Sequence, residues 1–323
     1  MQFLDLCGMM EPDETTHPRS FPVINLFYGT DMTASALYDL VISGCIETEN
    51  PSSLLANFSG YETLHKENCI RIRNIPESAL ASVIGNQAEL SEQLDIAAIP
   101  AGLSLKNFRC AFFDMDSTLI CNECIDELAA LWGVGDQIAA ITERSMRGEL
   151  DFEQSLRERV ALLAGAPSDI IEQASLKLQP TPGAKEALQL MHRAGVSTYI
   201  LSGGFTQFAQ MVSDDYGMTN FVCNSLVIKN GKLTGEVTGP AGGKILDRSG
   251  KRRALEVIAR LHDCELSQCI AGGDGANDLE MIGAAGFGFA YHAKPIVAQA
   301  APYRVKYGTF QVVSDWFMES WQH

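Results

Sequence analysis

One stretch joins an apolar run directly to two carboxylates and two hydroxyls: Cys110-Ala111-Phe112-Phe113-Asp114-Met115-Asp116-Ser117-Thr118-Leu119-Ile120. A run this apolar is typical of a strand buried on both faces of a parallel sheet. Polar residues that follow such a strand lie at its carboxyl end, where open α/β sheets bind ligands. Two aspartates so close repel each other, and a divalent cation is the usual way to stabilise the pair. The stretch therefore predicts a Mg²⁺-dependent phosphoryl-transfer site with a carboxylate nucleophile.

The composition narrows the class of protein. The chain has 323 residues and a formal net charge of −16, which argues against a nucleic-acid or anionic-membrane partner, because both require basic patches. Its nine cysteines are an odd number scattered along the chain, which fits reduced thiols better than a disulfide framework. Residues 1–19 show no signal-peptide pattern, and no apolar run approaches the length of a membrane span. We therefore expect a soluble, cytoplasmic protein with a small-molecule substrate.

Residues 1–102 are predicted to form a small α+β domain. Its patterns predict two strands and two helices: strands at 21–28 and 69–75, and helices at 34–43 and 76–94. The segment Ile99-Pro100-Ala101-Gly102 is the predicted linker to the rest of the chain. No cluster of catalytic residue types occurs in this domain. Its role stays open between a degenerate regulatory module of the ACT-like type, a dimerisation surface that would make a homodimer, and a steric support for the helical cap of the following domain.

Residues 103–323 alternate between strand and helix patterns, which predicts an α/β fold: a doubly wound, mostly parallel sheet with helices on both faces. A helical cap at about 124–180 is inserted after the first strand. The expected elements are cap helices at 125–134, 137–146, 152–164 and 168–178, a helix ending at 193, strands at 196–201, from 269 and at 287–291, and a helix at 253–261. Residues 224–234 contain Asn230-Gly231, which predicts a hairpin turn there.

The two aspartates suit general acid–base and nucleophilic work. In extended backbone their side chains would point in opposite directions, so a turn beginning at Met115 is needed to bring both into one pocket. One carboxylate can then attack phosphorus while the other handles a proton. A calcium loop is the alternative, but the EF-hand pattern requires Gly at its sixth position and Glu at its twelfth, where this chain has Leu119 and Ile125.

Two further polar loops and a lysine belong to the same hypothesis. Ser202-Gly203-Gly204 follows the strand at 196–201 and can wrap phosphate oxygens. Gly272-Gly273-Asp274-Gly275-Ala276-Asn277-Asp278 follows the strand from 269, and Asp274 is a candidate metal ligand. Lys251 opens a helix and is a candidate for the cation that neutralises a transferring phosphoryl group. The family resemblance described below favours it over Lys244.

These motifs, in this order, resemble the haloacid dehalogenase superfamily over about residues 106–310. Further segments narrow the resemblance to the bacterial members that hydrolyse O-phospho-L-serine to serine and phosphate, the last step of the phosphorylated route to serine. Those segments are Glu123 to Leu128, Met146 to Phe152, Ser155 to Val160 and Tyr291 to Pro295.

The resemblance implies a role for each matching position. Asp114 would be the nucleophile and Asp116 the general acid/base. Mg²⁺ would be held by Asp114, by the main-chain carbonyl of Asp116 and by Asp274, while Asp278 would orient a lysine or support the ligands from behind. The implied substrate-binding residues are Ser202, Gly203, Lys251, Asn277, Glu123 and Arg157.

Glu123 and Arg157 also match the chemistry of the implied substrate. A carboxylate suits its ammonium group, and an arginine can bind its carboxylate through two parallel hydrogen bonds. Arg157 lies in the helical insertion, so substrate binding would close this cap over the site. One alternative is a related phosphatase or phosphotransferase for another phosphorylated small metabolite, which would not need both residues. Another is a non-catalytic switch that keeps a stable phospho-aspartate.

Cys121-Asn122-Glu123-Cys124 could indicate a zinc or redox site, but a structural zinc site needs a second pair of ligands at similar spacing, and the sequence offers none. His292 follows an apolar strand and is predicted to be structural rather than catalytic.

Overall fold

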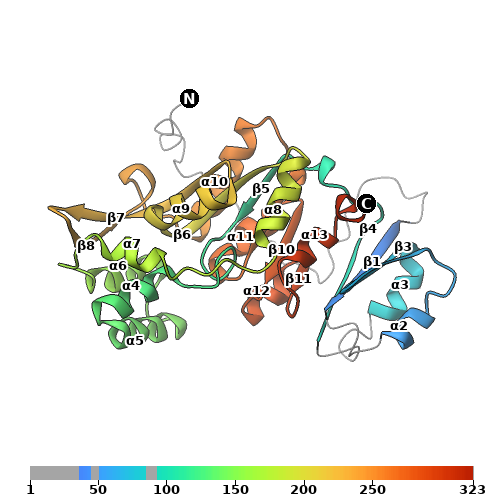
Figure 1. Cartoon of the computed structure of the whole chain (residues 1–323), viewed down its shortest axis with the longest axis horizontal. Helices are drawn as coiled ribbons and strands as arrows, with labels where there is room; N and C mark the ends of the chain where they lie inside the picture. The colour runs from blue at the N-terminus through green and yellow to red at the C-terminus, as the bar shows by residue number, and fades with distance from the viewer. Residues whose placement is uncertain (1–35, 45–50, 85–92, 323) are drawn as a thin grey trace.

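The computed structural model describes residues 36–44, 51–84 and 93–322, and these residues form a large and a small sheet (Figure 1). The large sheet has the strand order β11-β10-β9-β5-β6-β7-β8. Its strands are β5 (Cys110–Phe113), β6 (Ser197–Phe205), β7 (Asn220–Lys229), β8 (Lys232–Thr238), β9 (Cys269–Gly273), β10 (Phe287–Tyr291) and β11 (Tyr303–Val305). All neighbours pair in parallel except β7 and β8, which form the antiparallel hairpin predicted at Asn230-Gly231. The predicted doubly wound, mostly parallel sheet is confirmed.

Helices cover both faces of this sheet because its central strand is apolar on both sides. Phe112 packs in a cluster with Leu255 and Met281, whereas the next residue, Phe113, packs in the cluster that contains Leu188 and Val313. The helices around the sheet are α8 (Ala184–Arg193), α9 (Thr206–Tyr216), α10 (Arg248–Leu261), α11 (Leu279–Ala284), α12 (Pro295–Ala300) and α13 (Gln311–Asp315). Successive side chains of a strand point to opposite faces, so one run of apolar residues anchors two helical layers. Among the described residues, no helix is both long and apolar enough to cross a membrane.

The predicted helical cap lies between β5 and β6 in the chain. It consists of α4 (Cys124–Trp132), α5 (Gly135–Met146), α6 (Phe152–Ala161) and α7 (Ile170–Ser175). The β7–β8 hairpin extends beyond the sheet and supports these helices (Figure 1). The amide of Gly165 donates to the carbonyl of Leu233, and that of Ser168 donates to the carbonyl of Gly231. The cap is therefore fixed to the hairpin by main-chain hydrogen bonds.

The small sheet is antiparallel, with the order β2-β3-β1-β4. Its elements are β1 (Leu37–Gly44), α2 (Ser52–Ala56), β2 (Thr63–Lys66), β3 (Cys69–Pro76), α3 (Glu77–Ile84) and β4 (Leu94–Pro100). The helix predicted at 34–43 is wrong where the structure describes it, since this segment is β1. Leu40 and Ile42 pack beneath the domain's own helices, while Val41 packs toward the large sheet. A strand buried on both faces lacks the polar–apolar alternation that would have distinguished it from a helix.

Other boundaries in this region also differ from the predictions. The predicted linker at 99–102 is only partly correct, because Ile99 and Pro100 end β4 and only the next two residues form a turn. The predicted strand at 21–28 lies outside the described residues. The helix predicted at 76–94 begins as α3 and its end also lies outside them, while Leu94 already belongs to β4.

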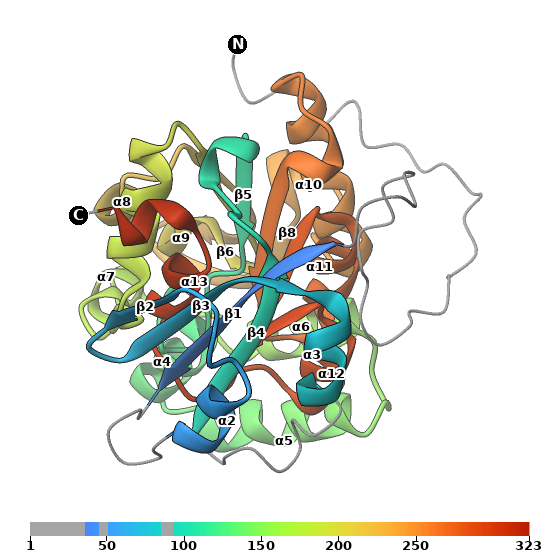
Figure 2. The same cartoon turned by 90° about the vertical axis from the view of Figure 1, so that its right-hand side faces the viewer.

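The small sheet lies against the C-terminal helical segments of the large sheet (Figure 2). Charged side chains join the two parts. Arg71 and Asp39 form a fully buried ion pair with a distance of 2.7 Å from Nη2 to Oδ2. The Arg71 guanidinium also donates 3.2 Å to the carbonyl of Trp316. Lys66 lies 2.7 Å from the carboxylate of Asp315. Because buried charges are tolerated only when they are paired, these contacts define one docked arrangement of the two sheets.

Candidate active site

The polar segments that the sequence singled out lie at the carboxyl ends of three adjacent strands, β9, β5 and β6. Ser202-Gly203-Gly204 was predicted to follow its strand, but β6 continues through it to Phe205. β5 lies between β9 and β6, so the later strands are divided between its two sides: β6, β7 and β8 lie on one side and β9, β10 and β11 on the other. Ligands bind at such a switch point in open α/β sheets, outside the carboxyl ends of the strands. The polar segments at the carboxyl ends of β5, β6 and β9 therefore lie together and form one candidate site.

The predicted turn after β5 is present. The carbonyl of Met115 accepts hydrogen bonds from the amides of Leu119 (2.9 Å) and Ile120 (3.1 Å). Ser117 has a φ of 54°, the left-handed conformation that tightens this turn. The carboxylate of Asp116 turns back to accept the amide hydrogen of Cys124 at 3.2 Å, at the start of α4. The turn thus separates the environments of the two aspartates while keeping both in the site.

Lys251 lies at the centre of the site, between two carboxylates. Its side chain is fully buried, and Nζ lies 2.6 Å from Asp114 Oδ2 and 2.6 Å from Asp278 Oδ1. Burial alone would lower the pKa of Lys251, but the negative charges of Asp114 and Asp278 outweigh it and hold the pKa above its usual value. Lys244, the alternative from the sequence, is exposed. The structure brings Lys251 to the predicted nucleophile and uses Asp278 to orient it.

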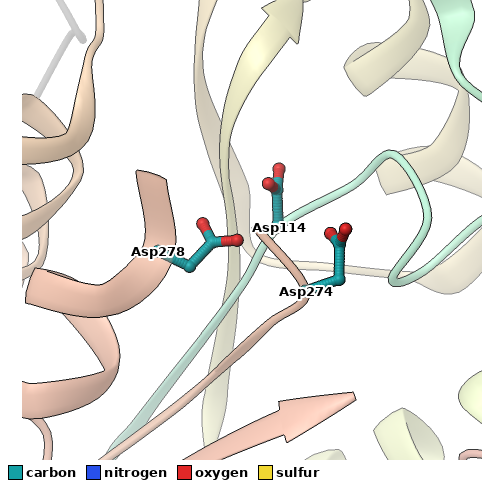
Figure 3. A group of neighbouring side chains, drawn as sticks. All are labelled: Asp114, Asp274 and Asp278. Atoms are coloured by element: carbon teal, nitrogen blue, oxygen red, sulfur yellow. The ribbon is translucent and has the colours of Figure 1, made fainter. Parts of the chain in front are cut away.

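Three carboxylates converge beside this lysine from the loops after β5 and β9 (Figure 3). Asp114, Asp274 and Asp278 each offer an oxygen, and these atoms lie within 4.8 Å of one another. Burial, followed by the charge of Asp114, raises the pKa of Asp274 to about 7 and that of Asp278 to about 8. Burial, followed by the charge of Glu123, raises the pKa of Asp116 to about 8. The group carries more negative charge than Lys251 alone offsets.

A divalent cation fits this group, because hard cations prefer carboxylate and carbonyl oxygens. Asp278 and Asp114 both have each carboxylate oxygen in a hydrogen bond: Lys251 donates to one oxygen of each, and the amides of Gly275 (3.0 Å) and Met115 (2.7 Å) donate to the others. Asp278 is the less accessible of the two, since its side chain is 0% exposed and that of Asp114 is 8% exposed. Asp274 is held by the hydroxyl of Thr118, which donates 3.3 Å to Oδ1. Asp114 and Asp274 are therefore the better candidates to hold a metal.

The two glycines near the carboxyl end of β6 have no room for a side chain. A Cβ on Gly203 would lie 2.6 Å from the ring of Phe152, which belongs to the cap, and one on Gly204 would lie 2.6 Å from Asp116 Oδ2. The carbonyl of Gly203 accepts a 2.9 Å hydrogen bond from the buried amide of Asn224. The amide of Gly204 donates 3.0 Å to the hydroxyl of Ser202. The carboxyl end of β6 therefore packs closely against both the general acid/base candidate and the cap.

Among the predicted substrate-recognition residues, the structure separates Glu123 from Arg157. Glu123 precedes α4, close enough for its charge to act on Asp116 and Asp274, and accepts a 2.8 Å hydrogen bond from the hydroxyl of Ser117. Arg157 instead lies half exposed on α6, 2.7 Å from Glu153, and donates 3.1 Å to the carbonyl of Val237. It is not brought to the acidic group.

Arg159, which the sequence analysis passed over, faces the acids. It is half buried, and its charge interacts with the carboxylates of Glu123, Asp126 and Asp116. Its Nε donates 3.3 Å to the carbonyl of Ser155. The helical periodicity of α6 could have identified Arg159. Arg159 lies on the same helix face as buried Ser155 and Leu156, whereas Arg157 lies on the same face as exposed Glu153.

The remaining candidates lie around this centre. Asn277 is half buried in the short 3₁₀ helix Ala276–Asp278, next to Gly275. Cys124 is buried and Cys121 is exposed, with the Cys121 sulfur 3.8 Å from the carbonyl of Pro180.

Comparisons with known proteins define the class. A sequence profile of the haloacid dehalogenase-like hydrolases matches residues 111–283, more than half of the chain. The chain therefore belongs to the haloacid dehalogenase-like hydrolases.

Within that family, the chain is similar to phosphoserine phosphatases. The enzyme of that name from Streptomyces coelicolor is 45% identical over 208 residues, which cover 64% of this chain and 50% of the relative. A probable phosphoserine phosphatase from Vibrio cholerae has a solved structure with a TM-score of 0.71 and 33% identity, covering 88% of this chain and 87% of that one. Another structure, titled as a phospho-aspartyl intermediate analogue of phosphoserine phosphatase, has a TM-score of 0.60 and 36% identity, covering 65% of this chain and 99% of that one. The chain spans about half the length of the Streptomyces relative.

Proposed function

We propose that this chain hydrolyses O-phospho-L-serine to L-serine and phosphate through a phosphoryl group carried on Asp114. The observation that supports this most is that the candidate site combines charged groups suited to a phosphoryl group with charged groups suited to an amino acid. Asp114, held by buried Lys251, suits a phosphoryl group. Glu123 and Arg159, opposite in charge and close enough to interact, suit the ammonium and carboxylate of an amino acid. The similarity to phosphoserine phosphatases supports the same substrate.

The proposed reaction uses two displacements. A carboxylate oxygen of Asp114 bonds to phosphorus while the bond from phosphorus to the serine oxygen breaks, and Asp116 donates its proton to that leaving oxygen. Asp116 then accepts a proton from water, whose oxygen bonds to phosphorus as the bond to Asp114 breaks. A raised pKa suits Asp116 to the first step, because the group must carry a proton near neutral pH. Lys251 offsets the charge on the transferring group, and Ser202 and Gly203 are proposed to hold its oxygens, with Asn277 beside the substrate.

Mg²⁺ is the proposed cofactor, held by Asp114, Asp274 and the main-chain carbonyl of Asp116. When bound, it would withdraw negative charge from the phosphoryl oxygens. The same proposal places the protein in the cytoplasm, acting on a small molecule without nucleic acid or membrane. A homodimer and the boundaries of the N-terminal α+β domain remain predictions.

The function is tested by measuring phosphate release from O-phospho-L-serine with Mg²⁺ and with EDTA. The proposal expects turnover that depends on the metal. Release from an aryl phosphate but not from phosphoserine would favour the related phosphatase that acts on another metabolite. Release from neither, with a stable phospho-aspartate, would favour the switch.

The metal proposal predicts that Mg²⁺ stabilises the folded chain. At about 100 times its Kd, a ligand that binds only the folded state contributes about 2.7 kcal/mol. We expect a corresponding rise in Tm for the wild type and a much smaller rise for Asp274→Asn, measured by thermal unfolding with and without Mg²⁺. Asp263→Asn is the matched control, because Asp263 is exposed and its φ of 47° also suits Asn. An equal rise in Tm for wild type and Asp274→Asn would contradict the assigned ligand.

The two arginines of α6 give a direct test of substrate recognition. Arg159→Ala should raise KM for phosphoserine by roughly 10- to 100-fold, because a charge-assisted hydrogen bond contributes about 1.5–3 kcal/mol. Arg157→Ala should leave KM nearly unchanged. With O-phosphoethanolamine, which lacks the carboxylate, the Arg159 variant should behave like the wild type. A larger increase in KM for Arg157→Ala than for Arg159→Ala would indicate that Arg157 binds the substrate carboxylate.

A further inference from the structure

Besides the contacts of Arg71 and Lys66, one carboxylate of the small N-terminal sheet is bound by a cradle of main-chain amides of the large sheet. Asp95, at the start of β4, is 6% exposed. Its Oδ1 accepts the amide hydrogen of Lys306 at 2.7 Å, and its Oδ2 accepts those of Tyr307 at 3.1 Å and Gly308 at 2.7 Å. Successive amides that point at one anion form a concave anion-binding site. Here the anion belongs to the other sheet of the same chain.

The cradle itself depends on a small residue. Gly308 has no room for a side chain, since a Cβ there would lie 2.5 Å from Val312 and 3.2 Å from Asp95 Oδ2. The loop at 306–308 directly follows β11. The position of this loop is therefore set jointly by β11 and by Asp95.

His292 connects the 306–308 loop to the candidate active site. Its Nε2 donates 2.7 Å to the carbonyl of Gly308, and its own amide donates 2.8 Å to the carbonyl of Val305. The residue has a φ of 43°, a conformation that needs support from its surroundings in a non-glycine residue. The two hydrogen bonds supply that support from the loop that Asp95 holds.

The next contact reaches the loop of the proposed metal ligand. Two residues after His292, the amide of Lys294 donates 3.2 Å to the carbonyl of Asp274. The charge of Lys294 also interacts with the carboxylates of Asp274 and Glu123. A continuous series of hydrogen bonds thus joins β4 to the acidic group.

We propose that Asp95 and His292 are positioning residues that fix the Asp274 loop, so that the N-terminal sheet sets the geometry of the metal site. Figure 1 shows this sheet at the end of the molecule opposite the cap, which argues against the third role considered above, a support for the cap helices. The proposal rests on the proposed metal site of the phosphatase. Carboxylate ligands must be held within fractions of an ångström, and loosening their supports weakens metal binding.

Asp95→Asn, His292→Asn and the double variant test this proposal in the full chain. Asn keeps the shape of Asp95 but turns an amide group toward main-chain donors, and at position 292 it tolerates the positive φ while failing to reach Gly308. The first measurement is the Kd of Mg²⁺ by calorimetry, which needs no catalysis. The second is the Mg²⁺ concentration that gives half-maximal phosphate release.

Each single variant should weaken Mg²⁺ binding by roughly 3- to 10-fold, less than the 10- to 100-fold typical of groups that hydrogen-bond a ligand's side chain directly. The double variant should be no weaker than the weaker single one, because effects that travel through the same contacts do not add. Lys66→Met is the matched control. It removes an ion pair at the same interface without touching the 306–308 loop, so it should lower Tm but leave the Kd of Mg²⁺ within about twofold.

Three outcomes would overturn the proposal. In the first, Asp95→Asn lowers Tm as Lys66→Met does but leaves the Kd of Mg²⁺ unchanged. In the second, Lys66→Met raises the Kd of Mg²⁺ as much as Asp95→Asn does, and in the third, the increases in Kd of Asp95→Asn and His292→Asn multiply in the double variant. His292 is exposed, so its variant decides the matter even where Asp95→Asn fails to fold. If wild-type chain binds Mg²⁺ but releases no phosphate, the proposed function fails while the calorimetric result still tests the positioning role.

Discussion

Asp114→Asn should abolish phosphate release, lowering kcat by about 10⁴-fold or more, the loss expected when a nucleophile is removed. The fold should survive this change. Lys251 keeps Asp278 as a partner, and the charge of Asp114 contributes to the raised pKa values of Asp274 and Asp278. Removing that charge relieves repulsion, so we expect Tm in EDTA to be unchanged or higher.

Asp116→Asn provides the matched comparison. With an aryl phosphate, whose leaving group needs no proton, this variant should still become phosphorylated but should lose the base for the second displacement. Intact mass spectrometry should then detect one added phosphoryl group on Asp116→Asn and none on Asp114→Asn. Turnover by Asp114→Asn that persists after deamidation has been excluded by mass would show that another group is the nucleophile.

The sequence predicted most of the site because its residues follow buried strands. Asp114, Ser202 and Asp274 each come directly after or at the end of an apolar run, and strand ends in a parallel sheet share one edge. The sequence already favoured Lys251 over Lys244, but only the structure shows that Lys251 is buried between two carboxylates while Lys244 is exposed. Local pattern therefore predicts where a loop lies better than where a long side chain points.

The parts that the sequence did not predict depend on contacts between distant segments. The strand β1 was predicted as a helix because packing against two different layers removed its alternation. Arg71 and Asp95 gave no local sign of their role, since each contacts a main-chain group that lies more than 200 residues away along the chain, Arg71 the carbonyl of Trp316 and Asp95 the amide of Gly308. The N-terminal residues, which include no cluster of catalytic residue types, therefore contact the large sheet through residues that are distant in the sequence. A prediction from local sequence patterns cannot identify such contacts.

Lys251→Met should be the most destabilising of the substitutions considered, and it should also inactivate the protein. Met has similar length and adapts to its surroundings, so the loss of charge dominates over the loss of volume. Asp114 and Asp278 would remain buried without their cation, and breaking a buried pair in this way costs about 3–5 kcal/mol. Thermal unfolding should show a large fall in Tm, and kcat should fall by roughly 10²- to 10³-fold with the loss of charge stabilisation.

Lys244→Met tests whether the effect is specific, because Lys244 is exposed and should tolerate the change in both stability and turnover. The double variant Lys251→Met/Asp278→Asn separates the two consequences. Neutralising Asp278 removes one uncompensated buried charge, so part of the lost stability should return, while turnover should stay low because the phosphoryl group still lacks its cation. If turnover returns together with stability, Lys251 acts only by holding the fold. If stability returns alone, the lysine has a separate role in the reaction, and Asp278 serves to hold that lysine at the nucleophile.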